Sequence, residues 1–340
     1  MNSARVDVHA HFVPRVYREA LAAAGVSRPD GMPSVPDWSE EAALAAMDTL
    51  GIRTAILSVS SPGVHFGDDA AARTLARRVN EEGARLCQAH PARFGLFASV
   101  PLPDLAGALA EAVYALDTLG AAGVIVETNH HGLYLGDERL DPLYAALHER
   151  RAVLFIHPTS PSCAGCDALA LGYPRPMLEF MFETTRSVAH MILSGVTARH
   201  PEMRVIVPHA GAALPVLAGR LELFGEMLAP ASTATPDVRA ALRSLYYDLA
   251  GAPVPELLNA LLAIADPLRL LYGSDWPWTP LAACVKLAGA LDATPSLGPA
   301  LRDAVMSGNA ARLFGERAAL TANEQRPLTA TSAARKGKPF

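Results

Sequence analysis

The chain has 340 residues, of which 51% are apolar, and a formal net charge of −5. Its length suits one large domain or two ordinary ones, and the apolar fraction is ample for a buried core. The mild charge without clustered Lys and Arg excludes a nucleic-acid footprint, and no apolar run of about 20 residues predicts a membrane span. Since the N-terminus lacks the layout of a secretory signal peptide, we expect a cytoplasmic protein with neither nucleic-acid nor membrane partners.

Strand-like runs alternate with helix-like runs along the whole chain. The expected strands are dense in Val, Ile, Leu and Phe with little alternation, which is typical of parallel strands buried on both faces. In chain order they are Val6–His11, Arg53–Val59, Arg93–Val100, Gly123–Glu127, Val153–His157, Arg204–His209, Leu245–Leu249 and Leu268–Ser274. Eight strands with helices between them predict an α/β fold, the (β/α)₈ TIM barrel. A doubly wound open sheet is the alternative, but no G-x-G-x-x-G follows the first strand.

The segments between the strands favour helices and two long loops. Helical spacing occurs at Asp69–Gln88, Leu105–Leu119 and Met177–Arg199. Ser39 has the character of an N-cap, and the Pro-rich segments 27–38 and 158–176 are expected to be loops that shape access to a site. We expect one barrel domain over residues 1–316 and a disordered tail over residues 317–340.

The four cysteines are too sparse for a disulfide framework, which fits a reducing compartment. Cys163 and Cys166 have the C-x-x-C spacing of half a zinc site or of a redox pair. No second C-x-x-C exists in the chain, and the pair follows no helix-start pattern. We therefore expect two free thiols in a loop, with the zinc or redox pair as the alternative.

The first expected strand ends in the pair His9 and His11. Residues i and i+2 of a strand point to the same side, so both imidazoles can bind one ion. Three later strands also end in a potential ligand, namely His157, His209 and Asp275. The carboxyl ends of barrel strands surround one pocket, so these side chains are expected to converge there. Imidazole and carboxylate together suit Zn²⁺, with Mn²⁺ or Fe²⁺ as alternatives.

Each of these residues alone also has a purely structural explanation. A single histidine at a strand end is more often buried and hydrogen-bonded than a ligand, and an aspartate there can cap the next helix. Their combination favours the metal site. Of the other histidines, His130 and His131 follow the fourth strand and could line the same pocket. The rest are expected to be structural or solvated; they are His65, His90, His148, His190 and His200.

The order and spacing of these residues resemble the amidohydrolase superfamily. More narrowly, the chain resembles the aminocarboxymuconate-semialdehyde decarboxylase (ACMSD) family, which also contains salicylate and resorcylate decarboxylases. The segments that carry the resemblance are VDVHAHFVP at 6–14, FETTR at 182–186, PHAGAALPVLAGR at 208–220 and LLYGSDWPW at 270–278. The resemblance covers roughly residues 5–315, and the stretch that ends in PHAGAALP is most similar to 6-methylsalicylate decarboxylases.

The resemblance implies one divalent metal ion, first of all Zn²⁺ and otherwise Mn²⁺. The implied ligands are His9, His11, His157 and Asp275. Asp275 and His209 would also act as catalytic groups in proton transfer and hydrogen bonding to the substrate. Arg220 would reach the site of a neighbouring subunit and contact the substrate carboxylate, which implies a homodimer or a larger homo-oligomer. Trp276 and Trp278 would bind the ring of a small aromatic acid.

Two residues that some related enzymes use are missing from this chain, and their absence narrows the expected metal content and substrate. Binuclear members of the superfamily bridge two metal ions with a carboxylated lysine after the fourth strand, but this chain has no lysine before Lys286. We therefore expect one metal ion. The helical segment SEEAALAAMDTLG also lacks the arginine with which aminocarboxymuconate-semialdehyde decarboxylases bind their substrate. A monocarboxylate such as a salicylate is thus favoured over a dicarboxylate semialdehyde.

These observations predict a carboxy-lyase that decarboxylates a hydroxybenzoate resembling 6-methylsalicylate without oxidation. A proton from Asp275 or from a metal-linked water would join the ring carbon that bears the carboxylate, and CO₂ would leave as aromaticity returns. His209 and the metal would stabilise negative charge on oxygen. The main alternative is a mononuclear hydrolase of a lactone or amide, because the same ligands can activate water. A third alternative is a binding protein that has the barrel fold but catalyses no reaction.

Overall fold

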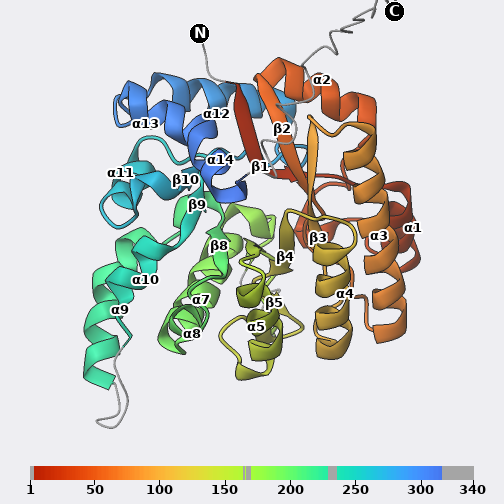
Figure 1. Ribbon diagram of the computed structural model, residues 1–340, viewed down its shortest axis with the longest axis horizontal. Coiled ribbons are helices and arrows are strands. Elements are labelled where there is room, and N and C mark those ends of the chain that lie inside the picture. The colour runs from red at the N-terminus through yellow and green to blue at the C-terminus, as the bar shows by residue number, and fades with distance from the viewer. Residues whose placement is uncertain (1–3, 164, 166–169, 229–235, 316–340) are drawn as a thin grey trace, which may run out of the picture.

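The computed structural model describes residues 4–163, 165, 170–228 and 236–315. Eight parallel strands form one sheet in the order β1-β2-β3-β4-β7-β8-β9-β10 (Figure 1). They are β1 (Arg5–His11), β2 (Ile52–Ser58), β3 (Phe94–Ser99), β4 (Gly123–Glu127), β7 (Val153–His157), β8 (Arg204–Val207), β9 (Tyr246–Asp248) and β10 (Leu270–Leu271). All eight predicted strands are therefore confirmed. A small antiparallel hairpin, β5 (Asn129–His130) and β6 (Leu133–Tyr134), follows β4.

The sheet closes on itself where β10 meets β1. Asp7 forms a parallel bridge with Tyr272, and the Val8 amide donates to the Tyr272 carbonyl at 3.0 Å. Gly273 permits this close approach, because a Cβ at that position would lie 2.8 Å from the Cβ of His9. The closed sheet with helices outside it is the predicted (β/α)₈ barrel.

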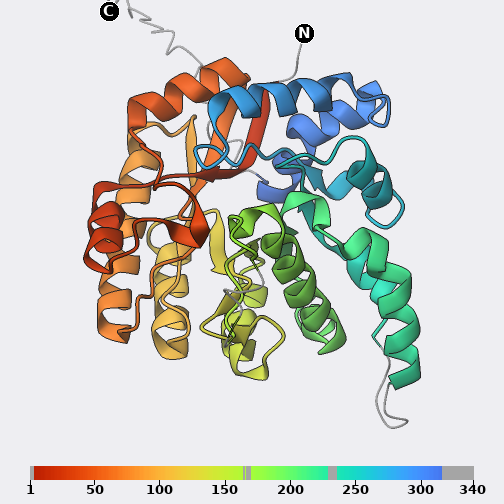
Figure 2. The ribbon, with the colours of Figure 1, turned by 180° about the vertical axis from the view of Figure 1, so that it is seen from behind.

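Helices surround the strands in both views (Figures 1 and 2). The longer ones are α1 (Arg15–Ala23), α2 (Glu40–Leu50), α3 (Asp69–Ala89), α4 (Leu105–Asp117), α5 (Asp141–Glu149), α7 (Glu179–Leu193), α9 (Leu214–Leu228) and α12 (Leu281–Ala293). The shorter ones are α8 (Val196–Arg199), α10 (Val238–Ser244), α11 (Glu256–Leu262), α13 (Pro299–Asp303) and α14 (Asn309–Phe314). Single turns of tighter or wider helix are η1 (Pro29–Gly31), η2 (Glu138–Leu140), η3 (Arg175–Met177), η4 (His209–Gly211), η5 (Pro267–Arg269) and η6 (Ala304–Gly308). The predicted cap of α2 is confirmed, since the Ser39 hydroxyl accepts from the Ala42 amide at 3.1 Å.

Two predicted elements differ from the structure. The helix expected over Met177–Arg199 is divided into α7 and α8 at Gly195, whose φ of 79° lies in the left-handed region that glycine adopts without strain. The strand expected over Leu268–Ser274 is reduced to β10. After its two residues the chain keeps a single bridge to β1 and then turns at Asp275, whose φ is 61°. That turn removes the segment from the sheet and directs it toward the strand ends.

Apolar side chains fill the inside of the barrel and the layer between strands and helices. The inner cluster consists of Val6, Val8, Ile56, Phe97, Ile125, Val153, Phe155, Ile206, Leu271, Ala310 and Leu313. The last two belong to α14. The side chain of Arg204, the first residue of β8, donates to the Leu313 carbonyl at 2.7 Å. Helix α14 therefore covers the end where the strands begin, which leaves the opposite end for the site.

Three expectations concern features outside the barrel itself. The tail predicted over residues 317–340 lies outside the described residues, as does Cys166. Cys87 and Cys284 are free thiols, whereas Cys163 is disulfide-bonded, so the expectation of a free thiol is wrong for Cys163. Within the described part of the chain, no helix combines the length and hydrophobicity needed to cross a bilayer.

Candidate active site

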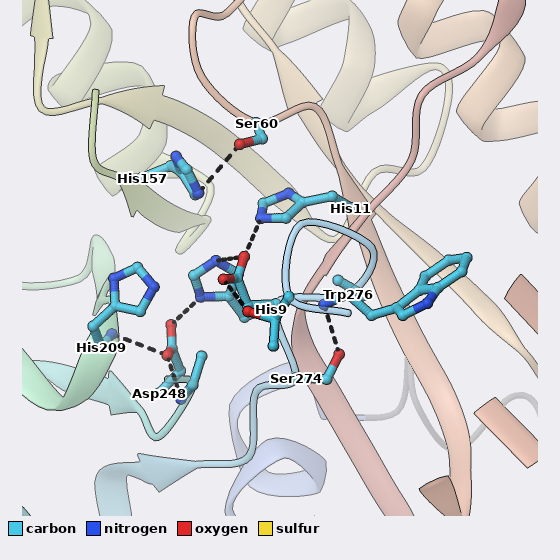
Figure 3. Close-up of polar contacts among 12 residues, drawn as sticks. His9, His11, Ser60, His157, His209, Asp248, Ser274 and Trp276 are labelled. Atoms are coloured by element: carbon cyan, nitrogen blue, oxygen red, sulfur yellow. Dashed lines mark hydrogen bonds and ion pairs between the residues drawn. The ribbon is translucent and has the colours of Figure 1, made fainter. Parts of the chain in front are cut away.

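Four side chains meet at the carboxyl ends of the strands. His9 and His11 lie two residues apart on β1, His157 is the last residue of β7, and Asp275 follows β10. One nitrogen or oxygen atom from each lies within 4.8 Å of the corresponding atoms of the others. The three imidazoles are buried and face a common centre (Figure 3). The structure thus brings together all four residues that were expected to bind a metal ion.

A hydrogen bond behind each imidazole sets its orientation. These bonds join Nδ1 of His9 to Asp248 Oδ2 (2.9 Å), Nδ1 of His11 to the Ser58 carbonyl (3.3 Å) and Nδ1 of His157 to the Pro158 carbonyl (2.8 Å). Since Nδ1 donates in each case, Nε2 keeps its lone pair for a ligand bond. The Nε2 atoms of His9 and His11 are buried without a well-formed hydrogen bond among the described residues, and each lies near Asp275 Oδ1, at 3.6 and 3.3 Å respectively. Leaving them unpaired would be costly, and a bound cation would remove that cost, so the residues fit a metal ion.

The ionisation states also suit a cation. Burial lowers the pKa of His11, and it holds the pKa of His157 well below the usual value, so both are neutral ligands. Burial alone would raise the pKa of Asp275, but the neighbouring imidazoles of His11, His9 and His209 outweigh it and lower the pKa. Burial would lower the pKa of His9, yet the Asp248 carboxylate outweighs it and raises the pKa to about 9. Without a metal ion His9 therefore holds a proton, which metal binding displaces.

A cavity of about 420 Å³ opens over this cluster. His157, His209 and Asp275 lie in its lining. Apolar side chains form much of the remaining wall; they include Met32, Met177, Phe180, Met181, Leu257 and Trp278. Met32 comes from the segment 27–38 and Pro176 from the segment 158–176, so both predicted loops shape the cavity. The volume and lining suit a small, largely apolar ligand with one or two polar groups.

Comparison with known proteins places the chain in a family. The amidohydrolase family pattern matches residues 6–315. The chain belongs to this family. This amidohydrolase is 40% identical to 6-methylsalicylic acid decarboxylase acuB of Aspergillus aculeatus over 293 residues, which cover 83% of this chain and 87% of that protein. It is 36% identical to decarboxylase yanB of Aspergillus niger over 324 residues, or 91% and 87% of the two chains.

Solved structures agree with the barrel fold of this amidohydrolase. A crystal structure of an amidohydrolase II has a TM-score of 0.87 and 36% identity, and the match covers 91% of this chain and 99% of that one. A 2,6-dihydroxybenzoate decarboxylase complexed with 2,6-dihydroxybenzoate has a TM-score of 0.77 at 24% identity, covering 92% and 99% of the two chains. Together with the family match, these findings confirm the resemblance to the amidohydrolase superfamily that the sequence motifs indicated.

Asp248 contacts the metal cluster from behind His9 and was not singled out by the sequence motifs. It ends β9, and its Oδ2 pairs with His9 while its Oδ1 accepts from the backbone amides of His209 (3.1 Å) and Ala250 (3.0 Å). Burial would raise its pKa, but the charge of His9 outweighs this and keeps the pKa low. The sequence does carry a signal for Asp248: an aspartate interrupts the apolar run of the seventh expected strand, as histidines or an aspartate end four of the others.

His209 lies beside the four clustered side chains rather than among them. Its ring centroid is 5.0 Å from that of His9, and its φ of 53° turns the residue out of the line of β8. Nδ1 of His209 is buried and lacks a hydrogen-bond partner among the described residues. This atom is therefore free to meet a polar group of a ligand in the cavity.

The three residues expected to bind substrate lie in three different places. Trp278 lines the cavity. Trp276 does not; it packs against the core beside α2, and its side chain points away from the three imidazoles (Figure 3). Arg220 is exposed on α9, with its guanidinium 4.6 Å from the centre of the Phe224 ring. Within one chain, only Trp278 of these three can contact a ligand in the cavity.

The histidines after β4 line a different cavity. His130 and His131 border a space of about 510 Å³ beside the first one and do not line the metal cavity. Nε2 of His130 accepts from the Glu127 amide at 3.2 Å, and Nε2 of His131 lies 3.2 Å from Nδ1 of His65. The part of the chain that the structure describes holds no second group of three or more ligating side chains. A single metal ion therefore agrees with the geometry.

Proposed function

We propose that this amidohydrolase decarboxylates a hydroxybenzoate, with 6-methylsalicylate as the first candidate substrate. The observation that supports this is the four-residue cluster in a cavity of about 420 Å³ with a largely apolar wall, which suits one substituted aromatic ring. The curated relatives are decarboxylases of the amidohydrolase superfamily, so the predicted carboxy-lyase class is confirmed and the hydrolase alternative is not favoured.

The proposed cofactor is one divalent metal ion held by the four clustered side chains. Three imidazoles and one carboxylate suit Zn²⁺. Mn²⁺ is the alternative, and it is bound in a dihydroxybenzoic acid decarboxylase from Polaromonas that shares the fold. When bound, the ion supplies positive charge that holds substrate oxygens and stabilises negative charge on them. Metal analysis after purification without chelators should find about one ion per chain, and its identity decides between the two metals.

The proposed reaction replaces the ring carboxylate with a proton. A proton bonds to the ring carbon that carries the carboxylate, the bond between that carbon and the carboxylate breaks, its electron pair restores the aromatic ring, and CO₂ leaves. Asp275 is the proposed donor. Its low resting pKa means that it must first gain a proton, which an anionic substrate beside it favours by raising that pKa. Thr279 orients the group by donating to Asp275 Oδ2 at 2.8 Å, and His209 would hold a substrate oxygen through Nδ1.

CO₂ release from aromatic acids tests this proposal directly. The purified, metal-loaded protein should release CO₂ from 6-methylsalicylate or 2,6-dihydroxybenzoate, and the ring product should appear in equal amount. A panel of lactones and amides, followed for acid release, tests the hydrolase alternative. Turnover of that panel with no CO₂ from any hydroxybenzoate would overturn the decarboxylase proposal.

We also propose that two copies pair through α9, which lies at the edge of the molecule (Figures 1 and 2). One stripe of this helix exposes large apolar side chains, namely Val216, Leu223, Phe224 and Met227. With Arg220 between them, each member of this stripe lies three or four residues from another, which places them on one helix face. Exposed apolar clusters of this kind mark interfaces. Arg220 lies on the same stripe, so an interface there is the route by which its guanidinium could reach the substrate of a second copy.

Replacing Arg220 with alanine should lower kcat/KM by about tenfold or more without changing the metal content, because a charged hydrogen bond to a carboxylate contributes about 1.5–3 kcal/mol. Steady-state kinetics and metal analysis on the same preparation measure both effects. Arg243→Ala removes an exposed arginine from α10 and is the matched control. Wild-type kinetics in Arg220→Ala would show that the arginine does not contact substrate.

Replacing Trp278 should mainly affect activity, whereas replacing Trp276 should mainly affect stability. Trp278→Ala should raise KM by about tenfold, since it removes an aromatic wall of the cavity. Trp276→Ala should leave KM within about twofold but reduce the free energy of unfolding by about 2–3 kcal/mol, somewhat less than for a fully buried tryptophan. Urea unfolding and steady-state kinetics measure the two effects, and a larger KM change in Trp276→Ala would contradict the assignment.

A further inference from the structure

The cavity over the metal cluster has acidic residues but no lysine or arginine among its described lining residues. Among the described residues that line it, Asp275 and Asp30 are acidic and none is Lys or Arg. Asp275 belongs to the metal cluster, so its charge is met by the bound cation. Asp30 has no such role, and its carboxyl lies in a wall that is otherwise apolar or neutral.

The surrounding structure holds the Asp30 carboxyl in place as an acceptor. Oδ1 accepts from the Ser160 amide at 3.2 Å and from the Ser160 hydroxyl. Burial raises the pKa of Asp30 above its usual value, and hydrogen bonds from Ser160 and Ser61 and the nearby charge of Arg175 only partly offset that rise. The residue also has a φ of 53°, a left-handed conformation that aspartate and asparagine tolerate better than most residues. Hydrogen bonds from Ser160 and Ser61 therefore hold the Asp30 carboxyl in position, beside the positive charge of Arg175.

Two adjacent residues of the cavity wall, Ser60 and Ser61, connect Asp30 to the metal cluster. Ser60 Oγ is 3.5 Å from Nε2 of His157, while the next residue, Ser61, hydrogen-bonds Asp30. Asp30 also lines the second cavity, so it forms part of the partition between the two spaces. A ring whose reacting carboxylate lies at the metal cluster would therefore direct a substituent toward this partition.

We propose that Asp30 is a specificity-determining residue that excludes ring substituents bearing a second negative charge and confines this protein to monocarboxylates. The inference rests on the proposed function, because it concerns the same cavity. The negative charges of Asp30 and of a second substrate carboxylate would repel each other strongly in a cavity of low dielectric. No lysine or arginine is among the described lining residues, and Arg175, whose charge acts on Asp30, does not line the cavity. A neutral methyl or hydroxyl at the same ring position avoids the repulsion. An arginine supplied by a second copy would be engaged by the reacting carboxylate.

The test compares substrates that differ by one carboxylate. Wild type and Asp30→Asn are assayed at about pH 8, well above the usual range of a carboxyl, with 6-methylsalicylate or whichever monocarboxylate the wild type converts. The same proteins are assayed with isomers that carry a second carboxylate at ring carbon 4, 5 or 6, both as substrates and as competitive inhibitors. Asp30→Asn should improve kcat/KM or the inhibition constant of at least one dicarboxylate, relative to the monocarboxylate, by about tenfold or more.

Ser160→Ala is the matched control, because it removes a hydrogen bond to Asp30 and leaves the charge. It should keep the ratio of dicarboxylate to monocarboxylate within about twofold of wild type. Asparagine suits the left-handed backbone, and Asp30→Gly, which adopts the same φ without strain, gives a second variant if Asp30→Asn is unstable. Unchanged ratios in both Asp30 variants, or an equal change in Ser160→Ala, would overturn the inference alone. A wild type that converts no hydroxybenzoate would overturn the proposed function as well.

Discussion

Asp275→Ala should abolish CO₂ release, with a loss of at least about 1000-fold in kcat. The substitution removes the only carboxylate of the metal cluster and the group proposed to deliver the proton to the ring. Thr279, which donates to Asp275 Oδ2, offers neither a carboxylate ligand nor an acid in its place. Single-turnover assays of CO₂ release, together with metal analysis on the same sample, measure the effect.

His9→Ala distinguishes the two roles of Asp275. It should also abolish turnover, but through loss of the metal ion, because it deletes one of four ligands and leaves Asp248 as an unpaired buried charge. Excess Zn²⁺ or Mn²⁺ should restore part of the activity of His9→Ala and none of that of Asp275→Ala. His148→Ala, a histidine substitution on α5 away from the cavity, is the control. Recovery of Asp275→Ala by metal would remove Asp275 from the proton-transfer step.

Asp248→Asn should weaken metal binding by about 10- to 100-fold. Both carboxylate oxygens accept hydrogen bonds, Oδ2 from His9 and Oδ1 from the amides of His209 and Ala250. An amide has one oxygen, so its NH₂ group would face either the His9 Nδ1–H or the two backbone amides. The resulting unpaired donor should also reduce the free energy of unfolding by about 1–3 kcal/mol. Competition with a metal chelator and urea unfolding measure the two quantities.

Asp69→Asn is the matched control for Asp248→Asn. Asp69 also pairs with a histidine, His65, at 2.9 Å, but its side chain is 62% exposed, whereas that of Asp248 is fully buried. Exposed pairs of this kind contribute little to stability. Asp69→Asn should therefore leave metal binding unchanged. Equal metal affinity in Asp248→Asn and wild type would show that the carboxylate does not orient His9.

The strands and the order of the ligands were predictable because both leave local marks in the sequence. Buried parallel strands appear as apolar runs, and a ligand at a strand end interrupts such a run abruptly. His157 and Asp275 are visible for this reason. Asp248 also interrupts the apolar run of the seventh strand, so the same pattern marks it as a residue of the site.

Other parts of the site depend on three-dimensional placement that no local pattern reports. Trp276 and Trp278 are two residues apart and look equivalent in the sequence, but the turn at Asp275 takes the segment out of the sheet, so one ring faces the core and the other the cavity. Asp30 lies in a Pro-rich loop, where an aspartate usually only stabilises a turn. Its contact with Ser160, 130 residues away, could not be inferred from spacing.

The seam between β1 and β10 joins the first and last strands of the barrel beside the metal cluster. Ser274 donates to Asp7 across 267 residues of sequence, and the Asp275 amide donates to the His9 carbonyl at 2.7 Å. During synthesis on the ribosome, His9 and His11 are made early, and almost the whole barrel must be synthesised before Asp275 follows. The cluster cannot be complete on a growing chain that ends before Asp275, so an ion held by all four side chains requires a chain that includes the last strand. A bound ion then links the first and last strands of the barrel and opposes its opening at the seam.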